Sequence, residues 1–194
     1  MSFFLALSRL IDAVNEKIGH LVSWALLLAV LICAGNAVVR YAFNMSSNSW
    51  LEIQWYLYGA VFLLGASYTL RRNEHVRIDV VAGRLSKPAQ VWIDILGFSL
   101  FLLPVTILIL YDSIPYALLS IQSQEYSTNS GGLIIWPAKL LIPVSFLLLA
   151  LQGGSELIKR IGYLTGHVEA DAFDKHVVTP EEEIAAIKAA NKID

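Results

Sequence analysis

Four long apolar segments constrain the fold of this chain more than any other feature of its sequence. The uncharged runs last 19, 18, 17 and 16 residues, at positions 21–39, 53–70, 95–111 and 140–155. A helix needs roughly 20 mostly apolar residues to cross the hydrocarbon core of a bilayer. A segment in lipid must also be helical, because each backbone polar group needs a partner within the protein. We therefore predict an all-α membrane protein with four transmembrane helices, at about residues 20–43, 50–71, 89–112 and 133–158.

The composition agrees with this class and argues against several others. The 194 residues are 56% hydrophobic and 15% charged, whereas an ordinary soluble domain has about 25% charged residues. The net charge of −2 gives no sign of a nucleic-acid partner. Cys33 is the single cysteine, so the chain has no internal disulfide and no CxxC metal site. Catalytic triads, paired carboxylates and phosphate loops are also missing from the sequence, which predicts a protein that is not an enzyme and has no cofactor.

The first 20 residues have an apolar pattern of their own, ahead of the first long run. Apolar side chains recur there at helical spacing, at Phe3, Leu7, Leu10, Ile11, Val14 and Ile18. This pattern predicts an amphipathic helix that lies on the membrane surface. A plain cytosolic extension of the first transmembrane helix fits the sequence equally well.

The chain ends in a polar tail, residues 163–194, which follows a membrane domain of residues 1–162. Thr179 in this tail can cap a helix, and Glu182 completes a capping box. A short cytoplasmic helix is therefore expected at about residues 180–190.

The lysines and arginines fix the expected orientation. Twelve of the 14 lie in the N-terminal segment, in the connector between the second and third spans, or after the fourth span, while Arg40 and Lys139 lie on the other side. Loops rich in Lys and Arg stay in the cytoplasm, which predicts that both termini are cytoplasmic. The connector, residues 71–87, holds five of these basic residues. It is expected to anchor the topology and to form a second short interfacial helix.

Charged side chains near the span ends suggest two ion pairs. Arg40 and Glu52 could meet across the short loop between the first two spans. Asp94, near the inner end of the third span, could meet Arg71 or Arg72. These groups lie within a turn or two of an interface, and none sits alone at mid-bilayer, where a coupling site for protons or sodium is expected.

Small residues form a stripe along the first span. Ala25, Ala29, Cys33 and Ala37 recur every four residues, and small side chains at this spacing let helix backbones approach closely. Gly65 in the second span could serve the same purpose. The stripe either packs inside the bundle or docks against another membrane subunit, and the sequence does not separate the two.

Residues 49–86 contain a series of motifs in a fixed order. Trp50 and Glu52 open the second span, Gly65 lies late in it, and Arg71 and Arg72 follow. A His–apolar–basic–apolar–Asp run comes next, at His75, Arg77 and Asp79. With these motifs the segment resembles the small membrane subunit, a DctQ-like small permease, of the tripartite ATP-independent periplasmic (TRAP) transporters.

Residues 136–153 are similar to the last span of the same family, and the resemblance covers about residues 15–162. The chain departs from the family pattern after Trp50, since the family often has two adjacent acids there and this chain has only Glu52.

The resemblance implies a function. In this family a periplasmic substrate-binding protein captures an organic acid, and a large membrane subunit moves it inward with sodium. The small subunit acts as a scaffold for the large one, in the bacterial inner membrane. The implied partners are the large TRAP membrane subunit, the periplasmic substrate-binding protein and membrane lipids. The residues expected at subunit or lipid interfaces are Ala29, Cys33, Ala37, Arg40, Trp50, Glu52, Gly65, Arg71, Arg72, His75, Arg77 and Asp79.

Two other functions fit a four-helix membrane chain. A free-standing transporter or channel needs a buried ionisable group on a pore face, and Asp94 is the candidate for it. A membrane anchor subunit of an enzyme complex usually needs histidines inside its spans to hold haem or quinone, and only His20 comes close to one.

Overall fold

The computed structural model describes residues 2–45, 47–73 and 85–169 of the chain. The regular elements in this part are helices, which confirms the all-α prediction there, with a single isolated bridge between Tyr126 and Ile134. The elements are α1 (Ser2–Phe43), α2 (Asn48–Arg71), α4 (Lys87–Gly97), the π-helix η1 (Phe98–Leu102), α5 (Leu103–Gln122) and α6 (Trp136–Leu164). The expected helices in the 71–87 connector and at 180–190 fall mainly or wholly outside the described residues.

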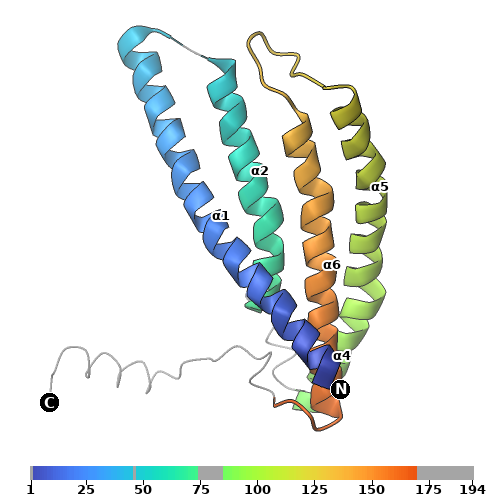
Figure 1. Cartoon of the computed structure of the whole chain (residues 1–194). Coiled ribbons are helices and arrows are strands. Elements are labelled where there is room, and N and C mark those ends of the chain that lie inside the picture. The colour runs from blue at the N-terminus through green and yellow to red at the C-terminus, as the bar shows by residue number, and fades with distance from the viewer. Residues whose placement is uncertain (1, 46, 74–84, 170–194) are drawn as a thin grey trace, which may run out of the picture.

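Three of the helical stretches are long and apolar enough to cross a membrane by length and composition. They are Phe3–Phe43, the continuous α4–η1–α5 stretch Lys87–Gln122, and Trp136–Leu164. The remaining long helix, α2, has 24 residues, or about 36 Å at 1.5 Å per residue. It runs beside α1 and α6 in the same bundle (Figure 1). The four-span arrangement stays a prediction for α2.

The N-terminal segment does not form a separate helix on the membrane surface. Helix α1 continues without a break from Ser2 to Phe43, so the alternative of an extended first helix is the one observed. The physical reason lies on its polar side, where Ser8 and Asn15 are buried against α6. The apolar side chains of Phe3 and Leu10 point away from the bundle and are exposed.

The helices form a bundle in which α2 and α6 are central. Helix α1 packs on α2, α2 packs on α6, and α6 packs on α5. The N-terminal part of α1 also crosses the C-terminal end of α6 (Figure 1). Two glycines allow close approach: a side chain at Gly19 would overlap the Tyr68 ring of α2, and one at Gly153 of α6 would meet Leu102.

The distribution of polarity is inverted relative to a soluble domain. Six of the described hydrophobic residues are buried, against fourteen polar or charged ones. Large apolar side chains such as Phe62, Phe101 and Tyr111 are strongly exposed. Soluble proteins bury apolar groups and rarely bury charges. An apolar exterior around a paired polar interior is instead stable when the surrounding solvent is lipid.

The third long helix contains a local irregularity at its middle. Residues Phe98–Leu102 form one π-helical turn, in which the Leu103 N–H donates to the Phe98 carbonyl. Pro104 follows directly and has no N–H to donate. Such turns shift the hydrogen-bond pattern and accommodate a proline inside a long helix.

Candidate functional site

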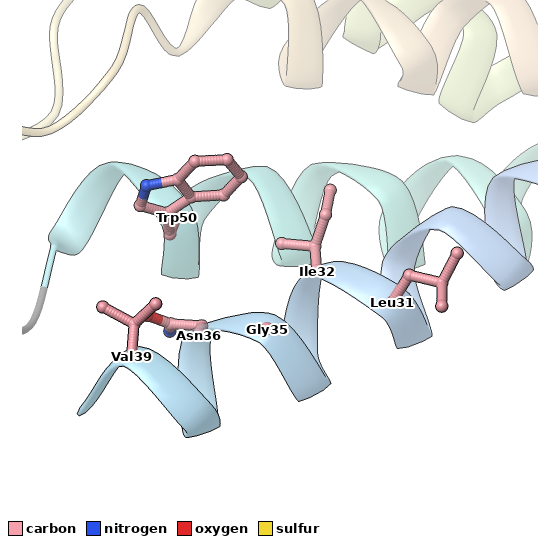
Figure 2. A pocket seen from close by; sticks show the side chains of 6 residues that line it. All are labelled: Leu31, Ile32, Gly35, Asn36, Val39 and Trp50. Carbon is pink, nitrogen blue, oxygen red and sulfur yellow. The ribbon is translucent and has the colours of Figure 1, made fainter. Parts of the chain in front are cut away.

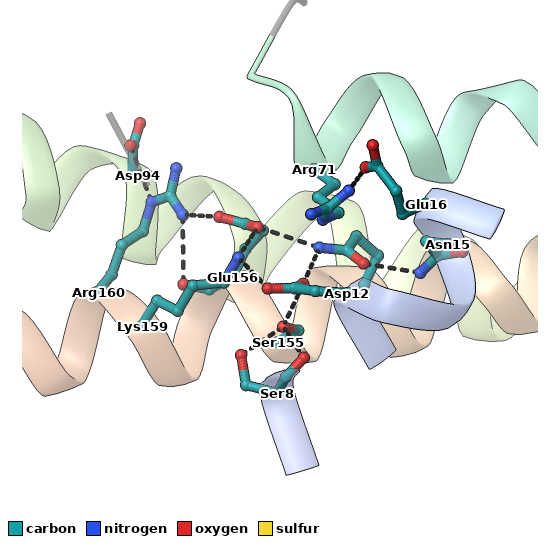
Figure 3. A network of polar contacts seen from close by, with 11 residues as sticks. Ser8, Asp12, Asn15, Glu16, Arg71, Asp94, Ser155, Glu156, Lys159 and Arg160 are labelled. Atoms are coloured by element: carbon teal, nitrogen blue, oxygen red, sulfur yellow. Dashed lines mark hydrogen bonds and ion pairs between the residues drawn. The ribbon is translucent and has the colours of Figure 1, made fainter. Parts of the chain in front are cut away.

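Helices α1 and α6 meet through a buried set of polar residues, here called the α1–α6 cluster. In α1, Ser8, Asp12 and Asn15 are spaced by four and three positions and so share one helix face. In α6, residues 152, 155, 156 and 159 repeat the same spacing. The hydroxyls of Ser8 and Ser155 lie 2.6 Å apart, within the network drawn in Figure 3.

Gln152 lies at the centre of this cluster and is fully buried. Its amide nitrogen donates to Asp12 Oδ1 at 2.9 Å and to Glu156 Oε1 at 3.1 Å. Its carbonyl oxygen accepts from Asn15 Nδ2 at 2.7 Å. The two carboxylates fix the orientation of the amide, because the flipped amide would turn its oxygen toward both of them.

Two cations neutralise the acids of the cluster. Lys159 Nζ lies 3.0 Å from Asp12 Oδ2 and 2.6 Å from Glu156 Oε1. Arg160 is 1% exposed; its Nε lies 2.9 Å from Asp94 Oδ2 of α4, and its Nη1 lies 2.6 Å from Glu156 Oε2. Buried charges are costly unless each has a partner. These pairs therefore hold α1, α4 and α6 in one register.

Glu16 connects α2 to the same end of the bundle. Its carboxylate forms ion pairs with Arg71 and, at 2.7 Å, with Arg72. The guanidinium of Arg72 lies over the Tyr68 ring, 5.3 Å from its centre. The predicted pairing of Asp94 with Arg71 or Arg72 is therefore wrong, because Asp94 pairs with Arg160 and the two arginines pair with Glu16.

At the opposite end, Glu52 of α2 holds the loop of residues 123–135, and these contacts are called the loop cluster. Glu52 is 3% exposed. Its carboxylate accepts from the Ser127 hydroxyl, from Asn129 Nδ2 at 2.9 Å and from the Leu133 backbone N–H at 2.6 Å. The predicted Arg40–Glu52 pair is wrong: Arg40 is exposed, and this loop takes the carboxylate of Glu52.

Three further side chains of α2 bind the backbone of this loop. Asn48 Nδ2 donates to the Ser130 carbonyl at 2.9 Å, the Ser49 hydroxyl to the Gly131 carbonyl, and the Tyr56 hydroxyl to the Ile134 carbonyl at 3.0 Å. Gly131 has φ of +70°, a conformation that favours glycine. The loop is thus held firmly against α2.

An ion pair within the α5–α6 hairpin completes this end. Lys139 Nζ lies 2.5 Å from Glu125 Oε2, and the Ser120 hydroxyl donates to the same oxygen at 2.6 Å. The hydrogen bonds from Lys139 and Ser120 lower the pKa of Glu125 from its ordinary value. The ammonium of Lys139 also lies 4.2 Å from the centre of the Tyr116 ring.

The small-residue stripe is divided between the interior and the surface. Ala29 is fully buried, whereas Cys33 and Ala37 are exposed. A Cβ added at Gly65 would meet Val22 of α1 at an ordinary contact distance, so the approach of α1 and α2 does not require glycine there. Trp50 is 51% exposed and lines a groove between α1 and α2. His75, Arg77 and Asp79 lie outside the described residues.

The sequence reasoning missed the residues at the centre of the α1–α6 cluster: Ser8, Asn15, Gln152 and Ser155. Their helical spacing on facing helices was a usable signal. In the described part of the chain, no group of three or more His, Cys, Asp or Glu side chains is placed to hold a metal ion. The α1–α6 cluster is a set of structural contacts between helices, and the loop cluster holds the 123–135 loop against α2.

The chain was compared with known protein families, curated proteins and solved structures. The family model for tripartite ATP-independent periplasmic transporters, DctQ component, matches residues 28–162. This range contains the last part of α1 and the whole of the bundle from α2 nearly to the end of α6. Searches of curated proteins and of solved structures gave no match.

Proposed function

We infer the role of this chain from its family: it belongs to the DctQ components of the tripartite ATP-independent periplasmic (TRAP) transporters, and we propose that it is the scaffold on which the large membrane subunit is held. The family is a transporter component and not an enzyme family. It works with a large membrane subunit and a substrate-binding protein. The family and the three apolar helical stretches make the chain an integral membrane protein.

The proposal includes a topology. All four long helices cross the bacterial inner membrane, α2 among them, and both termini lie in the cytoplasm. The basic residues at the α1–α6 end support this orientation, since Arg71, Arg72, Lys159 and Arg160 gather there. The opposite end carries the uncharged tip of the 123–135 loop.

The observation that supports the scaffold role is that the buried charged groups pair with one another. Asp94, Glu156 and Arg160 are engaged with one another and hold helices together. A coupling site would need an ionisable group free to bind an ion or substrate. The sodium coupling and the organic-acid site are therefore assigned to the large subunit.

The same geometry disfavours the two other functions. A free-standing transporter would need Asp94 as the ionisable group on its pore face. Asp94 Oδ2 instead lies 2.9 Å from Arg160 Nε and is paired with it. A haem or quinone anchor would need His20 inside the bundle, but its side chain is 71% exposed and lies 3.4 Å from Glu16.

The exposed part of the small-residue stripe is the proposed docking face for the large subunit. Cys33 and Ala37 lie on the surface of α1, so they are open to a partner helix, whereas Ala29 already packs within the chain. Small residues favour close helix contact in lipid. His75, Arg77 and Asp79 are proposed to fix the cytoplasmic connector or to contact headgroups and the partner. Unchanged co-purification and uptake in both the His75→Ala and the Asp79→Ala variants would refute that connector role.

Co-purification tests the scaffold proposal. The tagged chain is expressed with its large subunit and extracted in a mild detergent, and the amount of large subunit recovered is measured. The Cys33→Phe/Ala37→Phe variant is expected to lose the large subunit. Ala42→Phe is the control, because Ala42 is also exposed but lies about 140° around the helix axis from Ala37. Equal recovery in all three would exclude this face as the docking site.

A further inference from the structure

A narrow groove lies between α1 and α2, at the end of the bundle where these helices connect. It has a volume of about 340 Å³ and is lined by Leu31, Ile32, Gly35, Asn36, Val39 and Trp50 (Figure 2). Its hollow comes from Gly35, where an added Cβ would meet nothing within 4 Å. The groove faces the surroundings of the bundle, because Leu31, Val39 and Trp50 are all exposed.

The polar groups of the groove lie toward one end. Asn36 and Trp50 are near the α1–α2 connection, while Leu31 and Ile32 lie deeper along α1. In the described part of the chain, neither the Asn36 amide nor the Trp50 indole N–H has a hydrogen-bond partner. Trp side chains favour the headgroup level of a bilayer. The position of Trp50 therefore indicates that the outer end of the groove lies at the depth of the headgroups.

A cation lies just beyond this end. Arg40 follows Asn36 by one helical turn and is exposed, and within the described residues it forms no ion pair. Along α1 the order is therefore a guanidinium, then hydrogen-bonding groups, then an apolar trough that runs toward the middle of the span. The same order exists in a phospholipid, whose phosphate is followed by ester carbonyls and an acyl chain.

We propose that this groove binds one phospholipid of the outer leaflet, with an acyl chain over Gly35, the ester carbonyls at Asn36 and Trp50, and the phosphate at Arg40. The inference rests on the proposed orientation of α1 and α2, but not on the scaffold role. A bound lipid would fill the space between the outer halves of α1 and α2, beside the loop that joins them.

The shape and lining of the groove suit a lipid chain. From Leu31 to Val39 the groove runs about 12 Å along the helix axis. Leu31, Ile32, Gly35 and Val39 make this length apolar, so an extended acyl chain can lie along it.

Native mass spectrometry of the full chain tests the proposal. The chain is purified in detergent and then mixed with phosphatidylglycerol, and retained lipid is counted. The wild type is expected to keep one lipid and Gly35→Leu to lose it, since the leucine fills the groove. Gly59→Leu on α2 is the matched control, because a Cβ there also meets nothing within 4 Å, and it is expected to keep the lipid. Both changes replace glycine within a helix by a better helix former, and circular dichroism checks the fold.

Two results would overturn the proposal. One is equal lipid retention in the wild type, Gly35→Leu and Gly59→Leu. The other is loss of the large subunit on Gly35→Leu with no lipid retained by the wild type, which would assign the groove to a partner helix. The phosphate contact has its own test: the wild type should retain phosphatidylglycerol in preference to diacylglycerol, and Arg40→Gln should lose this preference. No preference in the wild type would remove Arg40 from the site.

Discussion

Asn15 of α1 donates a hydrogen bond of 2.7 Å to Gln152 of α6, across 137 residues of sequence. Both side chains are fully buried. The contact places the N-terminal segment of the chain against its last helix. Together with the pairing of Glu52 with the 123–135 loop, it fixes the bundle at both ends and leaves the apolar surface between them available to lipid and partner subunits.

Replacing Gln152 by Ala should destabilise the chain. The change removes the donor shared by Asp12 and Glu156 and leaves Asn15 without its acceptor. A buried group left unsatisfied costs about 1–3 kcal/mol. Thermal unfolding in detergent measures the effect, with Gln122→Ala at an exposed position of α5 as the control. A melting temperature equal to that of the control would contradict the central place of Gln152.

Replacing Arg160 by Met should lower the free energy of unfolding more than Gln152→Ala does. Glu156 and Asp94 then lose their shared cation in a buried site, and breaking a buried pair costs about 3–5 kcal/mol. The triple variant Asp94→Asn/Glu156→Gln/Arg160→Met should regain part of the loss, because no unpaired charge remains. The measurement is chemical unfolding in detergent, with Arg9→Met as the exposed control. A triple variant less stable than Arg160→Met alone would argue against the charge-pairing explanation.

Replacing Glu52 by Gln should release the 123–135 loop. A glutamine can accept only through one oxygen, so the Leu133 N–H or the Ser127 hydroxyl loses its acceptor. Hydrogen exchange measured by mass spectrometry should show faster exchange for peptides that contain Ser127 and Leu133. Glu169→Gln, at an exposed position, should leave the exchange unchanged. Slow exchange retained in Glu52→Gln would mean that the loop is held by its backbone bonds alone.

The Glu125–Lys139 pair should make stability depend on pH in the acid range. The pKa of Glu125 is lowered in the folded chain from its ordinary value of 4.5. The unfolded chain therefore binds more protons between the two pKa values, and stability rises with pH there. The stabilisation is present above pH 4.5 and is lost as pH falls through the lower, folded pKa.

The comparison of wild type with Glu125→Gln isolates this effect. The difference in their melting temperatures should be constant from neutral pH to about pH 5 and should shrink below it. If the difference in melting temperature instead grows as the pH falls, the pKa of Glu125 is not lowered by folding and this explanation is wrong.

The sequence predicted most of the helices because their signals are local. The second helix was expected at residues 50–71 and is found at Asn48–Arg71. The last helix was expected from residue 133 but begins at Trp136, because the backbone at Leu133 and Ile134 is bound to Glu52 and Tyr56 instead.

The ion pairs were harder to predict because they depend on how distant helices are packed. Arg40 and Glu52 are close in sequence, which made their pairing plausible, yet Glu52 binds Ser127 and Leu133, more than 70 residues away. Similarly, Asp94 of α4 pairs with Arg160 of α6, which is 66 residues away in sequence. Periodicity gives the face on which a residue lies, but not the helix that this face meets.

Uptake into liposomes tests the scaffold account most directly. Liposomes are prepared with this chain alone, with the large subunit alone, or with both, and sodium-dependent uptake of an organic acid is measured after the periplasmic protein is added. The account predicts uptake only when both membrane chains are present and recovered as one complex. Uptake by this chain alone, or equal uptake by the large subunit without it, would contradict the account.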